Sequence, residues 1–160
     1  MIVVSDATPL IALVKIGQLD LLQQLFGGIL IPKMVYDEVV TNAAGRPGST
    51  EIHQAKWISV RSPEDQDRVA YLRSDLDAGE AEALVLAVEL DADWILLDET
   101  KARLAAEFLG LHFIGTIGVL LLAKRMGKLA VIRPLLEELR ARKFHISERV
   151  RRSVLDQAGE

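Results

Sequence analysis

The sequence has 160 residues, of which 50% are hydrophobic, 26% charged and 5% aromatic, with a formal net charge of −4. This length suits one compact domain with an adequate core, and the absence of cysteine excludes disulfides, thiolate metal sites and cysteine nucleophiles. The longest apolar runs are too short to span a bilayer, and the first residues lack the basic head and cleavage site of a signal peptide. We therefore expect a cytoplasmic enzyme or binding domain.

Short apolar runs rich in branched residues alternate with longer segments of helical period. Strands are predicted at residues 2–5, 29–31, 57–60, 94–97 and 112–114. Helices are predicted at residues 8–15, 18–26, 33–43, 49–56, 64–74, 79–91, 100–109, 116–126, 129–142 and 147–157. Because each strand is followed by a helix, the pattern is typical of an α/β fold with a parallel sheet covered on both faces.

Several residues mark the ends of these helices. Thr8 is expected to be an N-cap and Pro9 the first helical residue, while Gly110 and Gly127 are expected to end two later helices. The segment at residues 42–49 is either a mobile loop at the rim of a site or a plain linker between helices.

A single domain is expected over residues 1–160, with its core at about residues 2–126 and two C-terminal helices, at about 129–157, packed on it. Both C-terminal helices have an apolar stripe. In the last helix this stripe consists of Ile146, Val150 and Val154.

Acidic residues follow two of the predicted strands. Ligands of an open parallel sheet bind beyond the carboxyl ends of its strands, and Asp6 and Asp98 lie at these ends of the first and fourth strands. Asp6 has no obvious structural partner, because Thr8 is better placed to cap the next helix. Asp98 has a structural alternative, since it could cap the helix that begins at Glu99 or Thr100.

Three further acids lie on predicted helices, and two of them, Glu80 and Glu38, are candidates for the site. Glu80 shares an apolar helix face with Leu84, so its carboxylate needs a partner or must stay solvated at the helix end. The alternative to a functional role is a capping box, in which Asp77 caps the helix and Glu80 reaches back to it. Glu82 is expected on the solvent-exposed face. Glu38 lies at the inner edge of another helix, where it is either a rim residue or a ligand.

Four carboxylates at one edge would repel one another, and their pKa values would rise unless a cation neutralised them. With oxygen ligands and no cysteine, that cation would be Mg²⁺ or Mn²⁺, which activates water and binds phosphate oxygens. The pattern therefore predicts hydrolysis of a phosphate ester. A glycine-rich phosphate loop and a Gly-x-Ser-x-Gly motif are absent, and His53, His112 and His145 are not spaced as metal ligands.

Five segments of the chain match the motifs of a known family. They are residues 4–11 (VSDATPLI), 31–39, 77–83 (DAGEAEA), 96–103 and 109–118. In order and spacing they resemble the PIN-domain superfamily, and within it a compact prokaryotic branch related to VapC-type toxin ribonucleases. The resemblance implies a three-layer α/β/α sandwich with a central parallel sheet of four or five strands.

The resemblance also implies a Mg²⁺- or Mn²⁺-dependent endoribonuclease that leaves 3′-hydroxyl and 5′-phosphate ends. The acidic quartet of the family falls on Asp6, Glu38, Glu80 and Asp98. Asp6, Glu80 and Asp98 would bind the metal directly, and Glu38 directly or through water. Thr8 would help to hold the water shell of the metal. The fourth motif reads Leu-Asp98-Glu99-Thr, so Glu99 is the alternative to Asp98 as a ligand.

Basic residues are concentrated late in the chain. Residues 1–100 hold 7 Lys and Arg against 17 Asp and Glu, whereas residues 101–160 hold 12 against 6. This basic third could bind a polyanion, or it could be a helical surface that happens to be basic. The cations nearest the acidic edge in sequence, which would bind RNA phosphates, are Lys101, Arg103, Lys124 and Arg125. For Arg103 the alternative is an i,i+4 pair with Glu99.

The resemblance further implies an antitoxin protein that inserts a segment into the acidic cleft, a homodimer, and a bacterial or archaeal cytoplasm. Two other functions stay open at this point. One is a PIN-like module that binds RNA or protein without cutting it. The other is a phosphatase or receiver-type domain, which forms a phosphoaspartate and needs a lysine at a later strand end.

Overall fold

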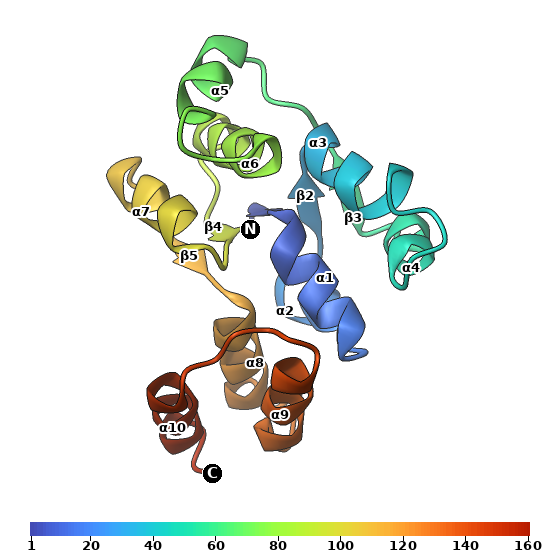
Figure 1. Cartoon of the computed structure of the whole chain (residues 1–160), viewed down its shortest axis with the longest axis vertical. Coiled ribbons are helices and arrows are strands. Elements are labelled where there is room, and N and C mark those ends of the chain that lie inside the picture. Colours follow the sequence, from blue (N-terminus) through green and yellow to red (C-terminus); the bar gives the residue numbers. More distant parts are fainter.

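The computed structural model describes residues 1–160 and has three layers, with helices on both sides of a central sheet (Figure 1). The sheet consists of β1 (Val3–Ser5), β2 (Ile29–Ile31), β3 (Ile58–Val60), β4 (Trp94–Leu96) and β5 (Phe113–Ile114). All strands are parallel, in the order β3-β2-β1-β4-β5. The prediction of an α/β fold with a central parallel sheet is confirmed.

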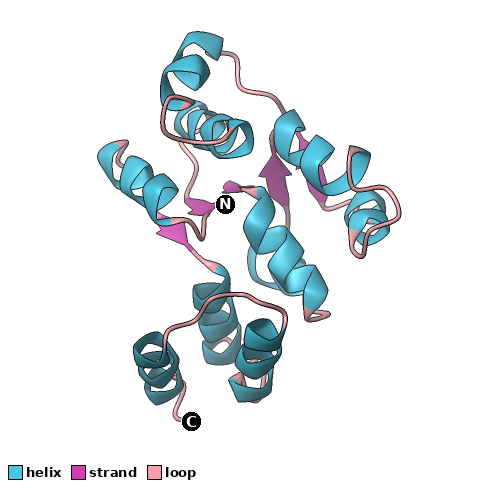
Figure 2. Ribbon diagram, viewed as in Figure 1, coloured by secondary structure: helices cyan, strands magenta, loops and turns pink.

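The helices connect and cover these strands (Figure 2). They are α1 (Ala7–Lys15), α2 (Leu21–Phe26), α3 (Lys33–Tyr36), the π-helical turn η1 (Asp37–Thr41), α4 (Ser49–Gln54), α5 (Gln66–Leu72), α6 (Ala78–Glu89), α7 (Thr100–Phe108), α8 (Thr116–Arg125), α9 (Arg133–Ala141) and α10 (Glu148–Gln157). All ten predicted helices are present. None of them combines the length and the apolar character needed to cross a membrane.

The structure corrects several predicted helix ends: α2 begins at Leu21 rather than at residue 18, and α9 at Arg133 rather than at residue 129. The helix α1 begins at Ala7, so Asp6 is its N-cap and Thr8 is already the second helical residue. The prediction that Thr8 caps this helix was therefore wrong, because Asp6 already has the extended backbone of a cap (φ −79°, ψ 173°). Gly110 and Gly127 follow the ends of α7 and α8 with a φ of +74°, as predicted.

Adjacent residues of β1 show how the sheet is sandwiched. Val3 packs in a buried cluster with α1, α2 and α8, whereas Val4 packs in a second cluster with α6 and α7. Successive side chains of a strand point to opposite faces, so both faces of the sheet are covered. This is the environment in which parallel sheets occur.

The strand order creates a switch point at β1. From β1 the chain builds β2 and β3 on one side, then crosses to β4 and β5 on the other. Ser5 pairs with Leu96, and the backbone N–H of Asp6 donates to the Leu96 carbonyl at 3.1 Å. The carboxyl ends of β1 and β4 therefore lie side by side, at the place where open α/β sheets bind ligands.

The helices α9 and α10 pack on the side of the sheet that α1 and α8 cover. Leu136 and Leu139 of α9 and Val154 of α10 belong to the same buried cluster as α1 and α8. Val150 was predicted to pack on the domain with the rest of the apolar stripe of α10. It is 43% exposed, so the prediction was wrong for this residue. That residues 1–160 fold as one domain stays a prediction.

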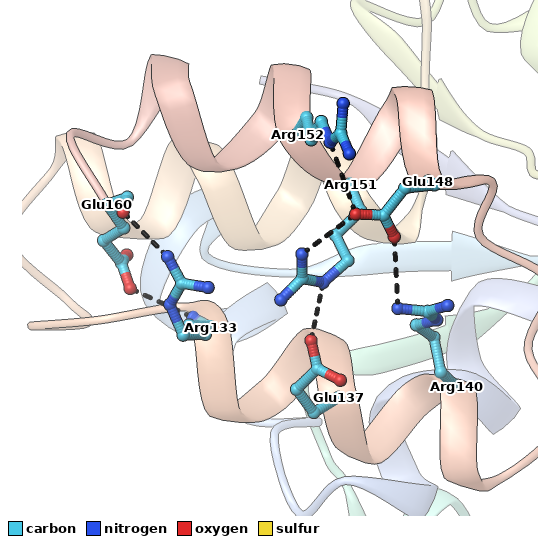
Figure 3. Close-up of polar contacts among 7 residues, drawn as sticks. All are labelled: Arg133, Glu137, Arg140, Glu148, Arg151, Arg152 and Glu160. Atoms are coloured by element: carbon cyan, nitrogen blue, oxygen red, sulfur yellow. Dashed lines mark hydrogen bonds and ion pairs between the residues drawn. The ribbon is translucent and has the colours of Figure 1, made fainter.

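Ion pairs join α9 to α10 at the surface (Figure 3). Arg151 Nε donates to Glu137 Oε1 at 2.7 Å, and Arg151 Nη1 lies 3.3 Å from Glu148 Oε1. The other oxygen of Glu148 lies 3.6 Å from Arg140 Nη1. Exposed pairs of this kind each contribute little to stability. Together, however, they neutralise several of the arginine charges in residues 101–160.

Half of the twelve cations in residues 101–160 are ion-paired with a carboxylate. They are Arg103, Lys124, Arg140, Arg142, Arg151 and Arg152. These contacts favour the interpretation of the basic third as a helical surface over that of a continuous polyanion site.

Candidate active site

Asp6 is the most buried carboxylate of the chain, with 3% of its surface exposed. It lies where β1 becomes α1, and its side chain makes no capping hydrogen bond. Burial is the main cause that raises the pKa of Asp6 from 3.8 to about 7. The backbone N–H of Ala7 opposes the rise, and the charges of nearby carboxylates add to it. The carboxylate therefore lacks the cationic partner that a buried charge requires.

The carboxylates that raise the Asp6 pKa are Asp77, Glu80 and Glu38. Asp77 caps α6, Glu80 lies in its first turn, and Glu38 comes from η1. The fold thus brings together three of the four predicted acids, Asp6, Glu38 and Glu80, at the switch point of the sheet. Asp77 joins them as a fourth member.

Gly79 lies beside two of these carboxylates. A Cβ atom on Gly79 would lie 3.5 Å from Asp6 Oδ1 and 3.6 Å from Asp77 Oδ1. Both oxygens therefore lie close to the Cβ position of Gly79, and the distance between them is at most the sum of these two distances. Because Gly79 has no side chain, both oxygens stay unobstructed on this side.

Glu80 takes part in the capping box that the sequence offered as its alternative role. Its N–H donates to Asp77 Oδ1 at 2.8 Å, and the Asp77 N–H donates to Glu80 Oε1 at 3.1 Å. Burial raises the pKa of Glu80, and the charges of Asp77 and Glu99 raise it further, against the hydrogen bond from the Asp77 backbone. The box orients the side chain and leaves Oε2 without a backbone partner, so the two roles are compatible.

Glu38 projects from a π-helical turn, a rare conformation that often occurs at functional sites. Its neighbour Asp37 is held by Lys33 and Thr41, each at 3.0 Å. Burial raises the pKa of Glu38, and the charge of Asp77 raises it further. The turn therefore directs two successive carboxylates to different partners, one to a lysine and the other towards the acidic group.

Asp98 is held by the start of α8. Its Oδ1 accepts the Thr116 N–H at 2.8 Å, and its Oδ2 accepts the Thr116 hydroxyl at 2.7 Å. Arg103 Nη2 lies 3.7 Å from Oδ1. Burial raises the pKa of Asp98, whereas Thr116 and Arg103 lower it, and no carboxylate contributes to the shift. Asp98 thus binds the start of α8. Its neighbour Glu99, and not Asp98, is the residue whose charge raises the pKa of Glu80.

The sequence did not single out Asp77 or Gly79 for the site. Asp77 was considered only as a cap, although a capping residue necessarily places its carboxylate at the same helix end as Glu80. Glu82 was expected on the exposed face, and that expectation was wrong. It is buried and accepts the Met34 N–H at 3.2 Å, because α3 packs against α6.

The four cations predicted to bind RNA lie in two places. Lys101 and Arg103 belong to the first turn of α7, close to Asp98 and Glu99. Lys124 and Arg125 lie at the far end of α8, roughly 12 Å from its start, where they bond to Glu160 at 2.8 Å and to Gln157 at 3.3 Å.

Arg103 does not form the alternative pair with Glu99. Its Nε donates to the Leu97 carbonyl at 3.0 Å, and its charge faces Asp98 instead. Thr8, predicted to support the metal, is half-buried and lines a cavity of about 230 Å³ beside Ile11 and Phe144.

The acidic group fits a hard divalent cation in its chemistry. All its donors are carboxylate oxygens, and no side chain at Gly79 covers the oxygens of Asp6 and Asp77 that face it. The side chains do not converge into a ready-made group of three ligands. Mg²⁺ requires no such group, because in proteins it retains several waters and binds through one or two carboxylates. The residues present are therefore compatible with a hydrated Mg²⁺ or Mn²⁺ ion.

In the metal-free protein, the raised Asp6 pKa should make stability depend on pH. A carboxyl group with a pKa of 3.8 in the unfolded chain and about 7 in the folded chain favours folding at low pH. This contribution should be lost as the pH rises towards 7. Above pH 7 in EDTA, we therefore expect Asp6→Asn to be more stable than the unmodified chain, with a free energy of unfolding about 1–3 kcal/mol higher.

The pH effect can be measured by urea unfolding between pH 4.5 and 8. Asp75→Asn is the control, because Asp75 is an exposed aspartate outside the acidic group. The difference between Asp6→Asn and the unmodified chain should vanish towards the acid end. A difference that is constant over the whole range would show that the Asp6 carboxyl group is not perturbed.

Comparison with known proteins agrees with this geometry. A family model described as PIN domain matches residues 2–160, whereas no curated protein matches the chain. PIN domains are generally nucleases and typically use divalent metal ions. Since the match covers nearly the whole sequence, the chain belongs to the PIN-domain family.

Proposed function

We propose that this protein is a Mg²⁺- or Mn²⁺-dependent endoribonuclease and the toxin component of a toxin–antitoxin pair. The observation that supports the nuclease activity best is that Asp6, Glu80 and Glu38 come together near the carboxyl end of β1. No Lys, Arg or His is among the groups that shift their pKa values. Membership of the PIN-domain family supports the same activity.

Each acid has a distinct part in this proposal. Asp6 and Glu80 would hold the cation directly, and Glu38 directly or through water, while Thr8 supports the water shell. When bound, the cation would lower the pKa of a water molecule and offset the charge that develops on the phosphate. Asp98 was predicted as a further ligand, but its contacts with Thr116 favour Glu99 in that position. Asp98 would then act by positioning α8 and Arg103.

The partners belong to the same proposal and rest on the resemblance to toxin ribonucleases. They are an RNA substrate, an antitoxin whose segment enters the acidic edge, and a second copy of this chain in a homodimer. Lys101 and Arg103 are the cations best placed to meet the RNA phosphates near this edge. A bacterial or archaeal cytoplasm is the proposed location.

The activity can be tested with a 5′-labelled single-stranded RNA. We expect cleavage in Mn²⁺, loss of cleavage in EDTA by at least about 100-fold, and recovery when Mn²⁺ is added in excess. The products should carry 3′-hydroxyl and 5′-phosphate ends. Cleavage that persists in EDTA, or products with 2′,3′-cyclic phosphates, would contradict the proposal, because the RNA 2′-hydroxyl would then be the nucleophile.

The RNA assay tests one of the two other candidate functions, and incubation with an acyl-phosphate donor tests the second. Binding of the RNA without cleavage would favour an inactive PIN-like module. A receiver or phosphatase would instead form a covalent adduct at Asp6 from an acyl-phosphate donor. The structure offers little support for that chemistry, because β5 ends at Ile114 and is followed by Gly115 and Thr116 rather than by a lysine.

A further inference from the structure

A cavity of about 580 Å³ lies where β4 and β5 end, with Asp98 in its lining. It lies between the end of β5, the start of α8 and the segment that leads from α9 into α10, which passes beside α8 in Figure 1. Asp98 and Thr100, the neighbours of Glu99, form one wall, and His145 and Val150 form another. Its volume is within the range of sites that bind small organic groups.

The apolar side of the cavity lacks a partner within the chain. Val150 belongs to the hydrophobic stripe of α10, yet 43% of it is exposed, and with Ile114 and Ile117 it lines this cavity. The rest of the stripe, Ile146 and Val154, is buried. The first turn of α10 therefore presents apolar surface to a space that the protein itself does not fill.

The polar side contains an arginine in a fixed position. Arg103 donates to the Leu97 carbonyl at 3.0 Å, faces Asp98 at 3.7 Å, and lies 5.3 Å from the centre of the Phe113 ring. A Cβ atom on Gly115 would collide with its Nη2, so only glycine at this position allows the guanidinium to lie there. The remaining N–H groups of the guanidinium can still donate to a ligand.

Hydroxyl and imidazole groups complete the polar side. Ser147 Oγ accepts the Val150 N–H at 3.2 Å as the cap of α10, so its own O–H remains free to donate. Thr100 and His145 are exposed and line the same cavity. Asp98 is the only carboxylate in the lining, and Thr116 and Arg103 already bind it. The cavity thus combines apolar surface with several donors and little free negative charge.

We infer that this cavity binds one nucleotide of a single-stranded RNA, next to the bond that is cut. The base would pack against Val150 and Ile117, its edges and the ribose would meet Ser147 and His145, and its phosphate would meet Arg103. Proteins recognise unpaired RNA by stacking a splayed base on aromatic rings or guanidinium planes and bonding to its edges, and Phe113, His145 and Arg103 supply such groups in this cavity. The inference rests on the proposed nuclease function and adds the path of the strand, from the acidic edge past Glu99 towards α10.

The histidines provide a direct test of binding that needs no cleavage. In EDTA, ribonucleoside 5′-monophosphates should shift the imidazole ¹H–¹³C signal of His145 in a saturable way at millimolar concentrations. His53 bonds to Tyr36 at 2.7 Å, and His112 lies beside Trp94 with ring centres 5.8 Å apart. Because both lie outside the cavity, their signals should stay fixed. Equal shifts of all three signals, no shift at all, or the same shift with inorganic phosphate would overturn the inference.

A substitution that fills the cavity tests its part in cleavage. Val150→Trp should raise the KM for a short RNA about tenfold, a loss of about 1.4 kcal/mol, while kcat stays within about twofold. Val131→Trp is the matched control, because Val131 is 51% exposed in the segment before α9 and lies outside the cavity. Equal KM values for the two variants would contradict the inference. If the unmodified chain cuts no RNA, the proposed function fails, and the His145 signal still decides whether the cavity binds nucleotides.

Discussion

Replacing Asp6 by Asn is expected to lower RNA cleavage by at least about 100-fold without unfolding the protein. Asn has nearly the same shape as Asp, so the N-cap of α1 and the bond from the Asp6 N–H to Leu96 should persist. What is lost is the negative charge that would hold the cation. The rate of cleavage in Mn²⁺, compared with that of Asp75→Asn, provides the measurement.

The same variant should also lose its response to the metal. A ligand that binds the folded chain stabilises it by mass action, so Mn²⁺ should raise the Tm of the unmodified protein and of Asp75→Asn. It should leave the Tm of Asp6→Asn nearly unchanged. Unaltered cleavage by Asp6→Asn would eliminate the proposed mechanism, and an unaltered Mn²⁺ response would show that Asp6 is not a ligand.

The second large effect is expected at Asp98. Asp98→Ala should lower the free energy of unfolding by about 2–3 kcal/mol, because it leaves the Thr116 N–H without its cap and Arg103 without its ionic partner. Asp98→Asn retains one acceptor for the Thr116 N–H and should cost about 1 kcal/mol. Urea unfolding in EDTA measures both values without interference from a metal.

Glu99 provides the comparison that separates structural from ligand roles. It is exposed, so Glu99→Gln should change stability by less than about 0.5 kcal/mol. If Glu99 rather than Asp98 completes the site, this variant should weaken Mn²⁺ binding in a calorimetric titration, whereas Asp98→Asn should leave the affinity nearly unchanged. The reverse pattern would restore Asp98 as the direct ligand and leave Glu99 with no part in the site.

Much of the fold could be predicted from local patterns. The strands are short runs of branched residues, and the helices carry clear apolar periods, so all five strands and ten helices were found. The errors concern helix ends, which depend on backbone conformation as well as on residue type. At α1 both Asp6 and Thr8 suit a cap, and only the extended backbone of Asp6 decides between them.

The candidate site was only partly accessible from the sequence. Asp6 could be located because it follows a buried strand, and the ends of parallel strands share one edge. The partner of Asp98 could not be foreseen, since Thr116 is 18 residues away and meets it only through the packing of β4 beside β5. The burial of Glu82 depends in the same way on a neighbouring element, α3, which the period of α6 alone does not reveal.

The most direct test of the account is a crystal structure grown with Mn²⁺ and measured at a wavelength where manganese scatters anomalously. A single strong anomalous peak is expected beside Asp6 and Glu80, about 2.0–2.2 Å from their carboxylate oxygens, with Glu38 bound directly or through water. A crystal saturated with Mn²⁺ that shows no peak between Asp6, Glu38 and Glu80 would contradict the central claim that these carboxylates meet to hold a cation.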